Sequence, residues 1–298
     1  MNQQYKNLSV RILCELFGKS RLAYYDHQKR EGRKEMVHHA VLELVTIIRE
    51  DLPRLGSKKL YFLIKPTLER EQIKIGRDAF HEMLRKYGMT VKKKRFYPKT
   101  TWSEHWLKKY PNLIKGIKLD HPNQLWVSDI TYIRIVDDFN YLSLITDAYS
   151  HRIVGYNLSE SLSSTGALNA LKMALTTLPE NSIFQLIHHS DRGVQYCSSD
   201  YTGLVMSRGI LISMTEDGDP RENAIAERVN GILKNEMRMG SVFKNRKQAL
   251  EILHNQIEIY NSKRPHLSCN YLTPDQAHQS SGELKRRWKN YYKKKVEC

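Results

Sequence analysis

The stretch LWVSDITYIRI (residues 125–135), followed by NYLSLITDAYSHRIVGYNL (140–158), determines the fold class. The first segment alternates apolar and polar residues and is rich in β-branched and aromatic side chains, which is typical of a β-strand. The second segment predicts two strands around a turn at Tyr149–Ser150. Together they predict three consecutive strands, which is an antiparallel start to a sheet.

The sequence after residue 158 continues with alternating helical and strand patterns. A capped helix is expected first, and two strands, a short helix and a long helix are expected after it. Their ranges are 163–178 (helix), 184–191 (strand), 201–209 (helix), 210–215 (strand) and 224–239 (helix). This order predicts an α/β domain built on a mixed sheet of five strands.

The residues before the sheet segments have helical periodicity. LSVRILCELFGKSRLAYY (8–25) is interrupted at Gly18 and predicts a helix-turn-helix with a short second helix after Ser20. An ordinary pair of packed helices fits this pattern equally well. Apolar faces within 41–48, 60–64 and 80–87 predict three further helices.

Positive charge is concentrated at the two ends of the chain. The net charge is +16, and residues 1–120 contain 27 Lys and Arg against 13 Asp and Glu. Residues 121–281 contain 14 against 17, and residues 282–298 contain 7 against 2. Basic ends suit contacts with DNA phosphates, and an acidic centre suits metal ligands.

A basic segment, VKKKRFYPKTTW (91–102), separates the helical and strand-rich parts. Its basic residues with interspersed aromatics predict contact with a DNA backbone, although a solvated linker has the same composition. The predicted DNA contacts in it are Lys92, Lys93, Lys94 and Arg95.

The cysteines and the hydropathy pattern bear on the cellular compartment. The four cysteines form no C-x-x-C pair, which disfavours a disulfide framework and a cysteine-based zinc site. No uncharged segment approaches the roughly 20 residues that span a bilayer. We therefore expect a soluble protein of the cytoplasm.

Three acidic residues occupy informative places in this order of elements. Asp129 lies within the first strand, Asp191 ends the fourth strand, and Glu227 lies in the first turns of the last helix. A buried carboxylate is unfavourable unless it is paired or binds a metal, and no lysine adjoins Asp129 or Asp191 in sequence. We expect these acids to hold two Mg²⁺ or Mn²⁺ ions about 4 Å apart, with Asp129 bridging them.

Neighbouring polar residues allow more than one role. Asn223, Glu227, Asn230 and Lys234 share one face of the last helix, which suits metal binding and contact with DNA. Asp147 is expected to cap a turn, with a catalytic role as the alternative. The pair His188 and His189 is expected to pack in the core or contact DNA rather than bind metal.

Four motifs in this order resemble the catalytic core of insertion sequence transposases. The strings WVSDITYI, ITDAYSHRIVGY, HHSDRGVQY and ENAIAERVNGILKNE are similar to those of the insertion sequence three family, OrfB type. The 35 residues between Asp191 and Glu227, and the basic Lys234 seven residues later, match the spacing of that family. PRLGSKKLYFLI and FHEMLRKYGM resemble its helix-turn-helix block, and YNSKRPHLSCNYLTPDQAH resembles its segment after the core.

The resemblance implies a ribonuclease H-like core shared with retroviral integrases, and Asp129, Asp191 and Glu227 as catalytic metal ligands. It implies a copy-out, paste-in DNA transposase that acts near the bacterial nucleoid as a multimer bridging two ends of the element. In that family the protein is often made as a fusion to an upstream reading frame, and the resemblance leaves open whether this chain acts alone or as such a fusion. The expected DNA contacts in the core are Lys234, Asn230 and Arg192. The histidine and cysteine zinc module of retroviral integrases has no counterpart here.

Three domains are expected: a helical DNA-binding region (1–112), the catalytic core (113–240) and a helical extension with a basic tail (241–298). Three other functions remain open at this point. A nuclease of the same fold would cleave without joining, a regulator would need only residues 1–112, and a tyrosine recombinase would form a covalent adduct with DNA.

Overall fold

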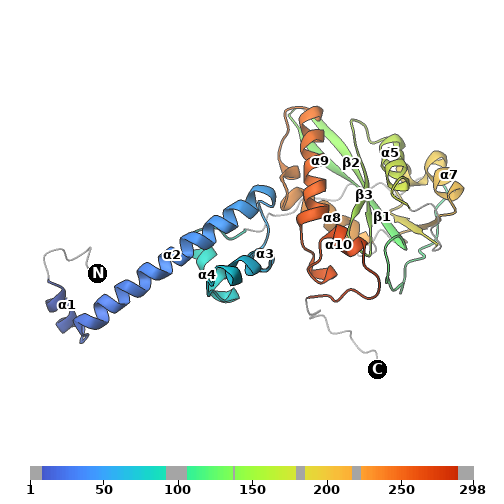
Figure 1. Ribbon diagram of the computed structural model, residues 1–298. Coiled ribbons are helices and arrows are strands. Elements are labelled where there is room, and N and C mark those ends of the chain that lie inside the picture. The colour runs from blue at the N-terminus through green and yellow to red at the C-terminus, as the bar shows by residue number, and fades with distance from the viewer. Residues whose placement is uncertain (1–8, 92–105, 137, 179–184, 217–222, 288–298) are drawn as a thin grey trace, which may run out of the picture. The chain divides into compact units, whose positions relative to one another are not determined.

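The computed structural model describes residues 9–91, 106–136, 138–178, 185–216 and 223–287 (Figure 1). They form two compact units. Residues 9–50 and 55–91 form the helical unit; residues 51–54 and the described residues from 106 onward form the sheet unit. The expected domain boundaries at 112 and 240 stay predictions, and residues 241–287 belong to the same compact unit as the sheet.

The helical unit begins with a short helix and a very long one. α1 (Val10–Leu16) starts at Ser9, whose side chain accepts a hydrogen bond from the Ile12 amide, and ends before Gly18 at φ 60°. α2 (Arg21–Asp51) then runs for 31 residues. The expected short second helix is therefore wrong, because after Ser20 no proline interrupts the helical sequence before Pro53.

The packed part of the helical unit contains α3 (Ser57–Arg70) and α4 (Arg77–Lys86), which lie against each other. Leu60 and Ile64 of α3 and Phe80 and Leu84 of α4 are almost completely buried. The segments that resemble a helix-turn-helix block thus form two packed helices, and the N-terminal helical region is confirmed.

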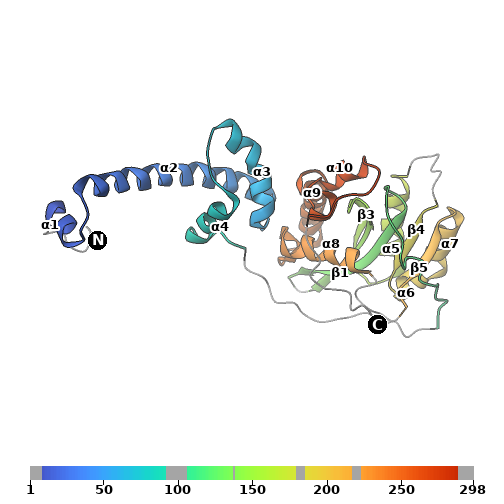
Figure 2. The same ribbon diagram turned by 90° about the horizontal axis from the view of Figure 1, so that it is seen from below.

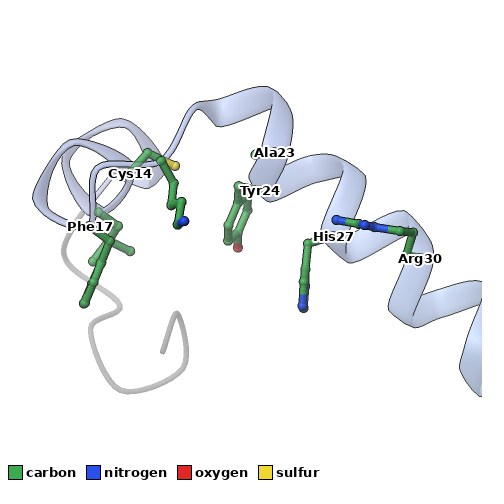
Figure 3. Close-up of a pocket in the computed structure, with 8 residues that line it drawn as sticks. Cys14, Phe17, Ala23, Tyr24, His27 and Arg30 are labelled. Carbon is green, nitrogen blue, oxygen red and sulfur yellow. The ribbon is translucent and has the colours of Figure 1, made fainter.

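A hollow of about 450 Å³ lies between α1 and the first turns of α2 (Figure 3). Its lining combines apolar side chains such as Leu13 and Phe17 with the basic groups Lys19, His27 and Arg30. Among the described residues, no acidic side chain lines this hollow.

The sheet unit contains five strands in the order β3-β2-β1-β4-β5. β1, β2 and β3 pair antiparallel, whereas β4 and β5 extend the sheet in parallel. The bounds are β1 (Leu125–Ile135), β2 (Asp138–Asp147), β3 (Ile153–Ser159), β4 (Ile187–Ser190) and β5 (Leu211–Met214). This mixed sheet confirms the predicted ribonuclease H-like fold class, with β4 shorter than expected.

Helices cover both faces of the sheet (Figures 1 and 2). On one face, Trp126, Ile145 and Val154 form a core with α5 (Ser164–Leu175), α6 (Val194–Cys197) and α7 (Ser199–Ser207). On the other face, Leu125 and Val127 contact Ala226 of α8 (Ala224–Asn235). α8 ends earlier than expected and is followed by the short helix η2 (Arg238–Gly240).

Helix α5 approaches β3 very closely at Gly155. A Cβ atom at this position would lie 2.2 Å from the Ala170 carbonyl oxygen and 2.8 Å from the Ala174 Cβ. Only glycine allows the helix and strand to meet at this distance, so this residue sets the spacing of the α5 layer.

The residues after η2 pack on the face of the sheet that α8 occupies. They form α9 (Arg246–Lys263), η3 (Leu267–Cys269) and α10 (Pro274–His278), and α9 contacts β1 and β3. The Asn261 side chain donates to the Ile153 carbonyl and accepts from the Ile153 amide, both at 3.0 Å. The C-terminal segment is thereby bonded directly to the edge strand of the sheet.

The cysteines in the described part of the chain, Cys14, Cys197 and Cys269, are buried free thiols. Within the same residues, no helix is both long and apolar enough to cross a membrane.

Candidate active site

Asp129 lies in the middle of β1, where it pairs with Leu144 of β2. Strand alternation directs its side chain to the same face as Val127, which is the face covered by α8. Its Oδ1 accepts a hydrogen bond from the Ile130 amide at 2.9 Å, and its Oδ2 accepts one from Asn230 Nδ2 at 2.7 Å. Both carboxylate oxygens are thus fixed in direction.

The electrostatic environment of Asp129 disfavours its charged form. Burial raises the pKa of Asp129 to about 7, and the negative charge of Asp191 contributes in the same direction. The hydrogen bonds from Asn230 and Ile130 oppose this rise, and the charge of Glu227 adds to it. Asp129 and Asp191 therefore form an interacting acidic pair, which a bound cation would stabilise.

Asp191 directly follows β4, the strand parallel to β1. Its Oδ1 accepts a hydrogen bond from the Gly193 amide at 3.0 Å. Burial raises the pKa of Asp191, and this hydrogen bond opposes the rise. A Cβ at Gly193 would lie 3.0 Å from that same oxygen, so glycine leaves room for the tight turn around the carboxylate.

Glu227 lies in the first turn of α8 and is exposed to solvent. Its charge acts on Asp129 less strongly than that of Asp191 does. Within the described residues, no three Asp, Glu, His or Cys side chains gather closely enough to hold a metal ion. The structure thus places Asp191 and Glu227 both within electrostatic range of Asp129, and the three-acid metal site stays a prediction.

Two asparagines of α8 face the strand that carries Asp129. Asn223 Nδ2 donates to the Ser128 carbonyl at 2.8 Å, and Asn230 Nδ2 donates to Asp129. Both side chains are at least nine-tenths buried, and neither Oδ1 has a hydrogen-bond partner among the described residues. The helical spacing predicts that both side chains lie on the same face of the helix as Glu227, but it does not predict their hydrogen bonds to β1.

Lys234 lies one further turn along α8 and is partly buried. Burial lowers the pKa of Lys234, and the negative charge of Asp129 opposes this effect. Although no lysine adjoins Asp129 in sequence, the fold therefore brings Lys234 within electrostatic range of it. Nothing in the local sequence around Asp129 signals this approach.

The remaining predicted DNA contacts fall into two groups. Arg192 is partly buried beside Asp191, and its contact with DNA stays a prediction, as does that of Asn230. The residues Lys92, Lys93, Lys94 and Arg95 lie outside the described residues.

The two histidines are core residues, as predicted. The Nε2 atom of His188 lies 2.7 Å from Ser128 Oγ and 2.9 Å from the Tyr201 hydroxyl, and burial lowers its pKa to about 3. His189 Nδ1 lies 2.9 Å from Ser213 Oγ. These contacts connect β4 to β1, α7 and β5.

Asp147 caps a turn, as predicted. Its Oδ1 accepts hydrogen bonds from the Ser150 amide at 2.8 Å and the Ser150 hydroxyl at 2.6 Å, and its Oδ2 accepts one from the Asn123 amide at 2.7 Å. Burial would raise its pKa, but hydrogen bonds from His278 and Ser150 outweigh burial and lower it. Asp147 is thus a structural acid, in contrast to Asp129.

Comparison with known proteins connects this site to a family. Residues 120–220 and 208–274 match two models described as integrase core domain. The IS600 uncharacterized 31 kDa protein of Shigella sonnei is 34% identical over 266 residues, which cover 88% of this chain and 96% of that protein. Transposase InsF for insertion sequence IS3A of Escherichia coli is 28% identical over 276 residues, covering 90% and 93%.

A similarity to solved structures is also found. The HTLV-2 integrase catalytic core domain in complex with magnesium is 19% identical, with a TM-score of 0.43 over 53% of this chain and 98% of that chain. From the 34% identity over nearly the whole of a curated relative and the two integrase core matches, the chain belongs to the insertion sequence three family of DNA transposases with an integrase-type core.

Proposed function

We propose that this transposase cleaves the ends of an insertion sequence and joins them to new DNA at two divalent ions, Mg²⁺ or Mn²⁺, held by Asp129, Asp191 and Glu227. The observation that carries the proposal is the acidic pair: burial raises the pKa of Asp129 to about 7, and the negative charge of Asp191 adds to the rise. Two carboxyl groups that disfavour each other's charge are stabilised together by a cation.

The donor atoms fit a hard divalent ion. Carboxylate and amide oxygens are the ligands that Mg²⁺ and Mn²⁺ prefer. Besides the acids, the buried Oδ1 atoms of Asn223 and Asn230 lie on the same helix face without a partner among the described residues. In this proposal Asp129 bridges the two ions, and Asp191 and Glu227 each hold one.

The chain's own residues orient these ligands. Asn230 and the Ile130 amide direct the two oxygens of Asp129, and the Gly193 amide directs Asp191. Lys234, on the same face of α8, is proposed to contact a phosphate of the DNA backbone, with Asn230 and Arg192 near it. When bound, the ions would activate the attacking oxygen and stabilise the leaving oxygen of a phosphoryl transfer.

The reaction has two steps of the same kind. Water attacks the phosphate at the end of the element, the P–O bond to the 3′ oxygen breaks, and this oxygen leaves as a free 3′-hydroxyl. That hydroxyl then attacks a second phosphodiester, forms a new P–O bond and releases another 3′-hydroxyl. Neither step consumes an external energy source or forms a bond between protein and DNA.

We assign recognition of the DNA ends to residues 1–112, including Lys92, Lys93, Lys94 and Arg95, and catalysis to residues 113–240. Residues 241–298 form a helical extension with a basic tail. A multimer of the chain bridges two ends, by a copy-out, paste-in route in the bacterial cytoplasm, and the chain acts alone or fused to an upstream frame.

The test uses purified protein, labelled end DNA and Mg²⁺. Asp129→Asn, Asp191→Asn and Glu227→Gln should each abolish cleavage and joining while DNA binding persists, because ligand charge is lost and the fold is kept. Asp147→Asn, a substitution of a buried turn acid, is the matched control and should retain both reactions. Near-normal joining by any of the first three variants would remove that residue from the site.

A further inference from the structure

A buried arginine lies at the C-terminal end of α9. The Arg264 side chain is 1% exposed, and its Nε and Nη2 atoms donate to Glu236 Oε2 at 3.2 and 2.6 Å. Its Nη1 donates to His266 Nε2 at 2.8 Å, and its guanidinium lies 5.9 Å from the centre of the Tyr260 ring. All the guanidinium nitrogens are thus engaged, which fixes the group in one orientation.

The acid that receives this arginine ends the helix of the active site. Glu236 is the C-terminal cap of α8, which carries Glu227, Asn230 and Lys234. Its Oε1 also accepts a hydrogen bond from Arg228, the residue after Glu227, at 3.2 Å. The carboxylate of Glu236 therefore connects the end of α8 to α9 and to the turn that holds Glu227.

The same end of α9 is bonded to the sheet. Asn261 makes two hydrogen bonds to Ile153 of β3, and the Tyr260 hydroxyl donates to the His151 carbonyl at 2.9 Å. Arg264 and these residues span one turn of chain, so a single short segment holds both α8 and the edge of the sheet. Figures 1 and 2 show α9 on the face of the sheet that α8 covers.

We infer that Arg264 is a positioning residue: through its ion pair with Glu236 it sets where α8 lies on the sheet, and hence where Glu227 lies relative to Asp129 and Asp191. The inference rests on the proposed metal site. It applies to the helix as a whole, because an α-helix is stiff over 12 residues and a shift at Glu236 displaces Glu227. Glu227 is the acid whose position depends most directly on this helix, since it lies on α8 itself whereas Asp129 and Asp191 lie in and directly after strands.

The end of α9 thereby gains a specific task. Groups that orient metal ligands commonly change metal affinity or activity by about 10–100-fold when they are replaced. A buried ion pair contributes little net stability but constrains geometry, since it is favourable only in one arrangement. The ion pair between Arg264 and Glu236 is therefore suited to fix the position of a helix rather than to stabilise the fold.

The experiment measures Mn²⁺ affinity of the full chain by electron paramagnetic resonance, with circular dichroism as the check of folding. Arg264→Lys keeps the positive charge but cannot make the forked contact, so the apparent dissociation constant for Mn²⁺ should rise about tenfold. Joining of end DNA in low Mn²⁺ should fall in parallel and recover when Mn²⁺ is raised. If Arg264→Lys does not fold, Glu236→Gln, which keeps the side-chain size, is held to the same criterion.

Arg152→Lys is the matched control. Arg152 Nε donates to Asp275 Oδ1 at 2.8 Å and ties the sheet to α10 without touching α8. Its substitution should leave Mn²⁺ affinity unchanged. A folded Arg264→Lys variant with wild-type affinity, or an equal loss in Arg152→Lys, would overturn the inference. Failure of the metal site itself is distinguishable, because Asp129→Asn would then also bind Mn²⁺ as the wild type does.

Discussion

Asp129 and Asp147 lie on adjoining strands, yet their carboxyl groups have opposite electrostatic surroundings. Asp147 accepts three hydrogen bonds in its turn, and its pKa is lowered. Asp129 has an acidic neighbour, and burial raises its pKa to about 7. The charged form of Asp147 therefore stabilises the fold, whereas the charged form of Asp129 destabilises it. A destabilised charge of this kind is expected at a binding site.

Asp129→Asn should therefore stabilise the metal-free protein. The folded chain keeps a proton on Asp129 at pH values where the unfolded chain has released it, so this residue reduces stability as pH rises from about 4 to 7. The melting temperature of the variant in EDTA should exceed that of the wild type by more at pH 8 than at pH 5. Mg²⁺ should raise the melting temperature of the wild type only.

Asp147→Asn is the control for this experiment and should behave in the opposite way. It should lose about 1–3 kcal/mol of stability at pH 7 because charge-assisted bonds are lost, and it should keep its response to Mg²⁺. The loss should shrink as pH falls through the lowered pKa of Asp147. Equal melting curves for wild type and Asp129→Asn at pH 8 would contradict the assignment of a raised pKa.

Lys234→Ala distinguishes a DNA contact from a role inside the metal site. If Lys234 binds a phosphate, the variant should bind end DNA more weakly, and the slope of log affinity against log salt should decrease by about one unit. The measurement is a titration of end DNA at several salt concentrations. A loss of cleavage with an unchanged slope would instead assign Lys234 a role inside the acidic site, where the negative charge of Asp129 acts on it.

At the scale of elements, the close contact between β3 and α5 requires glycine at position 155. Gly155→Ala would place a methyl group 2.2 Å from the Ala170 backbone oxygen, so the helix must move away from the strand. We expect a loss of about 1–3 kcal/mol or more, measured by urea unfolding, because neither backbone can yield easily.

Gly203→Ala is the matched control for this substitution. Gly203 lies inside α7, and a Cβ there would have no neighbour within 4 Å. Alanine favours a helix interior, so this variant should gain roughly 0.5–1 kcal/mol. Equal effects of the two substitutions would mean that the spacing of α5 and β3 is not set by glycine.

The elements that periodicity defines were predictable from sequence. The alternation of residues 125–135 matches β1 residue for residue, and helix α5 falls inside its expected range. The short second helix after Ser20 was wrong because the local turn signal at Gly18 says nothing about how far the next helix extends. β4 is shorter than its apolar run, because apolar residues next to a strand pack equally well in a loop.

The site was predictable only as a set of residue types. The positions of Asp129 and Asp191 follow from the order of strands, because Asp129 lies in β1 and Asp191 directly follows the adjacent strand β4. The bond from Asn230 to Asp129 joins residues 101 positions apart, and Arg264 lies 28 positions from Glu236. Such pairings depend on tertiary packing. A single sequence contains many polar and charged residues that could equally well be partners, so it does not identify the actual pairs.

At the scale of the whole molecule, the positive charge is distributed unevenly along the chain. Residues 1–120 hold 27 basic against 13 acidic residues, whereas residues 121–281 hold 14 against 17. Phosphate contacts supply affinity for DNA, and base contacts in a groove supply selectivity. Residues 121–281, with a slight excess of acidic residues, should therefore depend on basic residues elsewhere in the chain to approach DNA.

A fragment of residues 1–112 should bind the terminal DNA of the element in preference to unrelated duplex, with a steep salt dependence. A fragment from residue 113 should bind weakly and without preference. Competition binding at one fixed salt concentration compares the two fragments, with the full chain as reference. Discrimination by the second fragment alone would move recognition to the basic tail around Trp288 and Lys293.

Each compact unit contains at least one buried cysteine, whose reactivity reports whether that unit has opened. Burial raises the pKa of Cys197 and of Cys269 to about 11, and Cys14 is buried in the helical unit. The thiolate is the form that attacks an alkylating reagent, so buried thiols of the folded chain should resist alkylation until the surrounding unit opens. In a Cys298→Ser background, pulsed alkylation read by peptide mass spectrometry would time the opening of the helical unit at Cys14 and of the sheet unit at the other two. End DNA should then slow labelling in whichever unit it binds, without any attached dye.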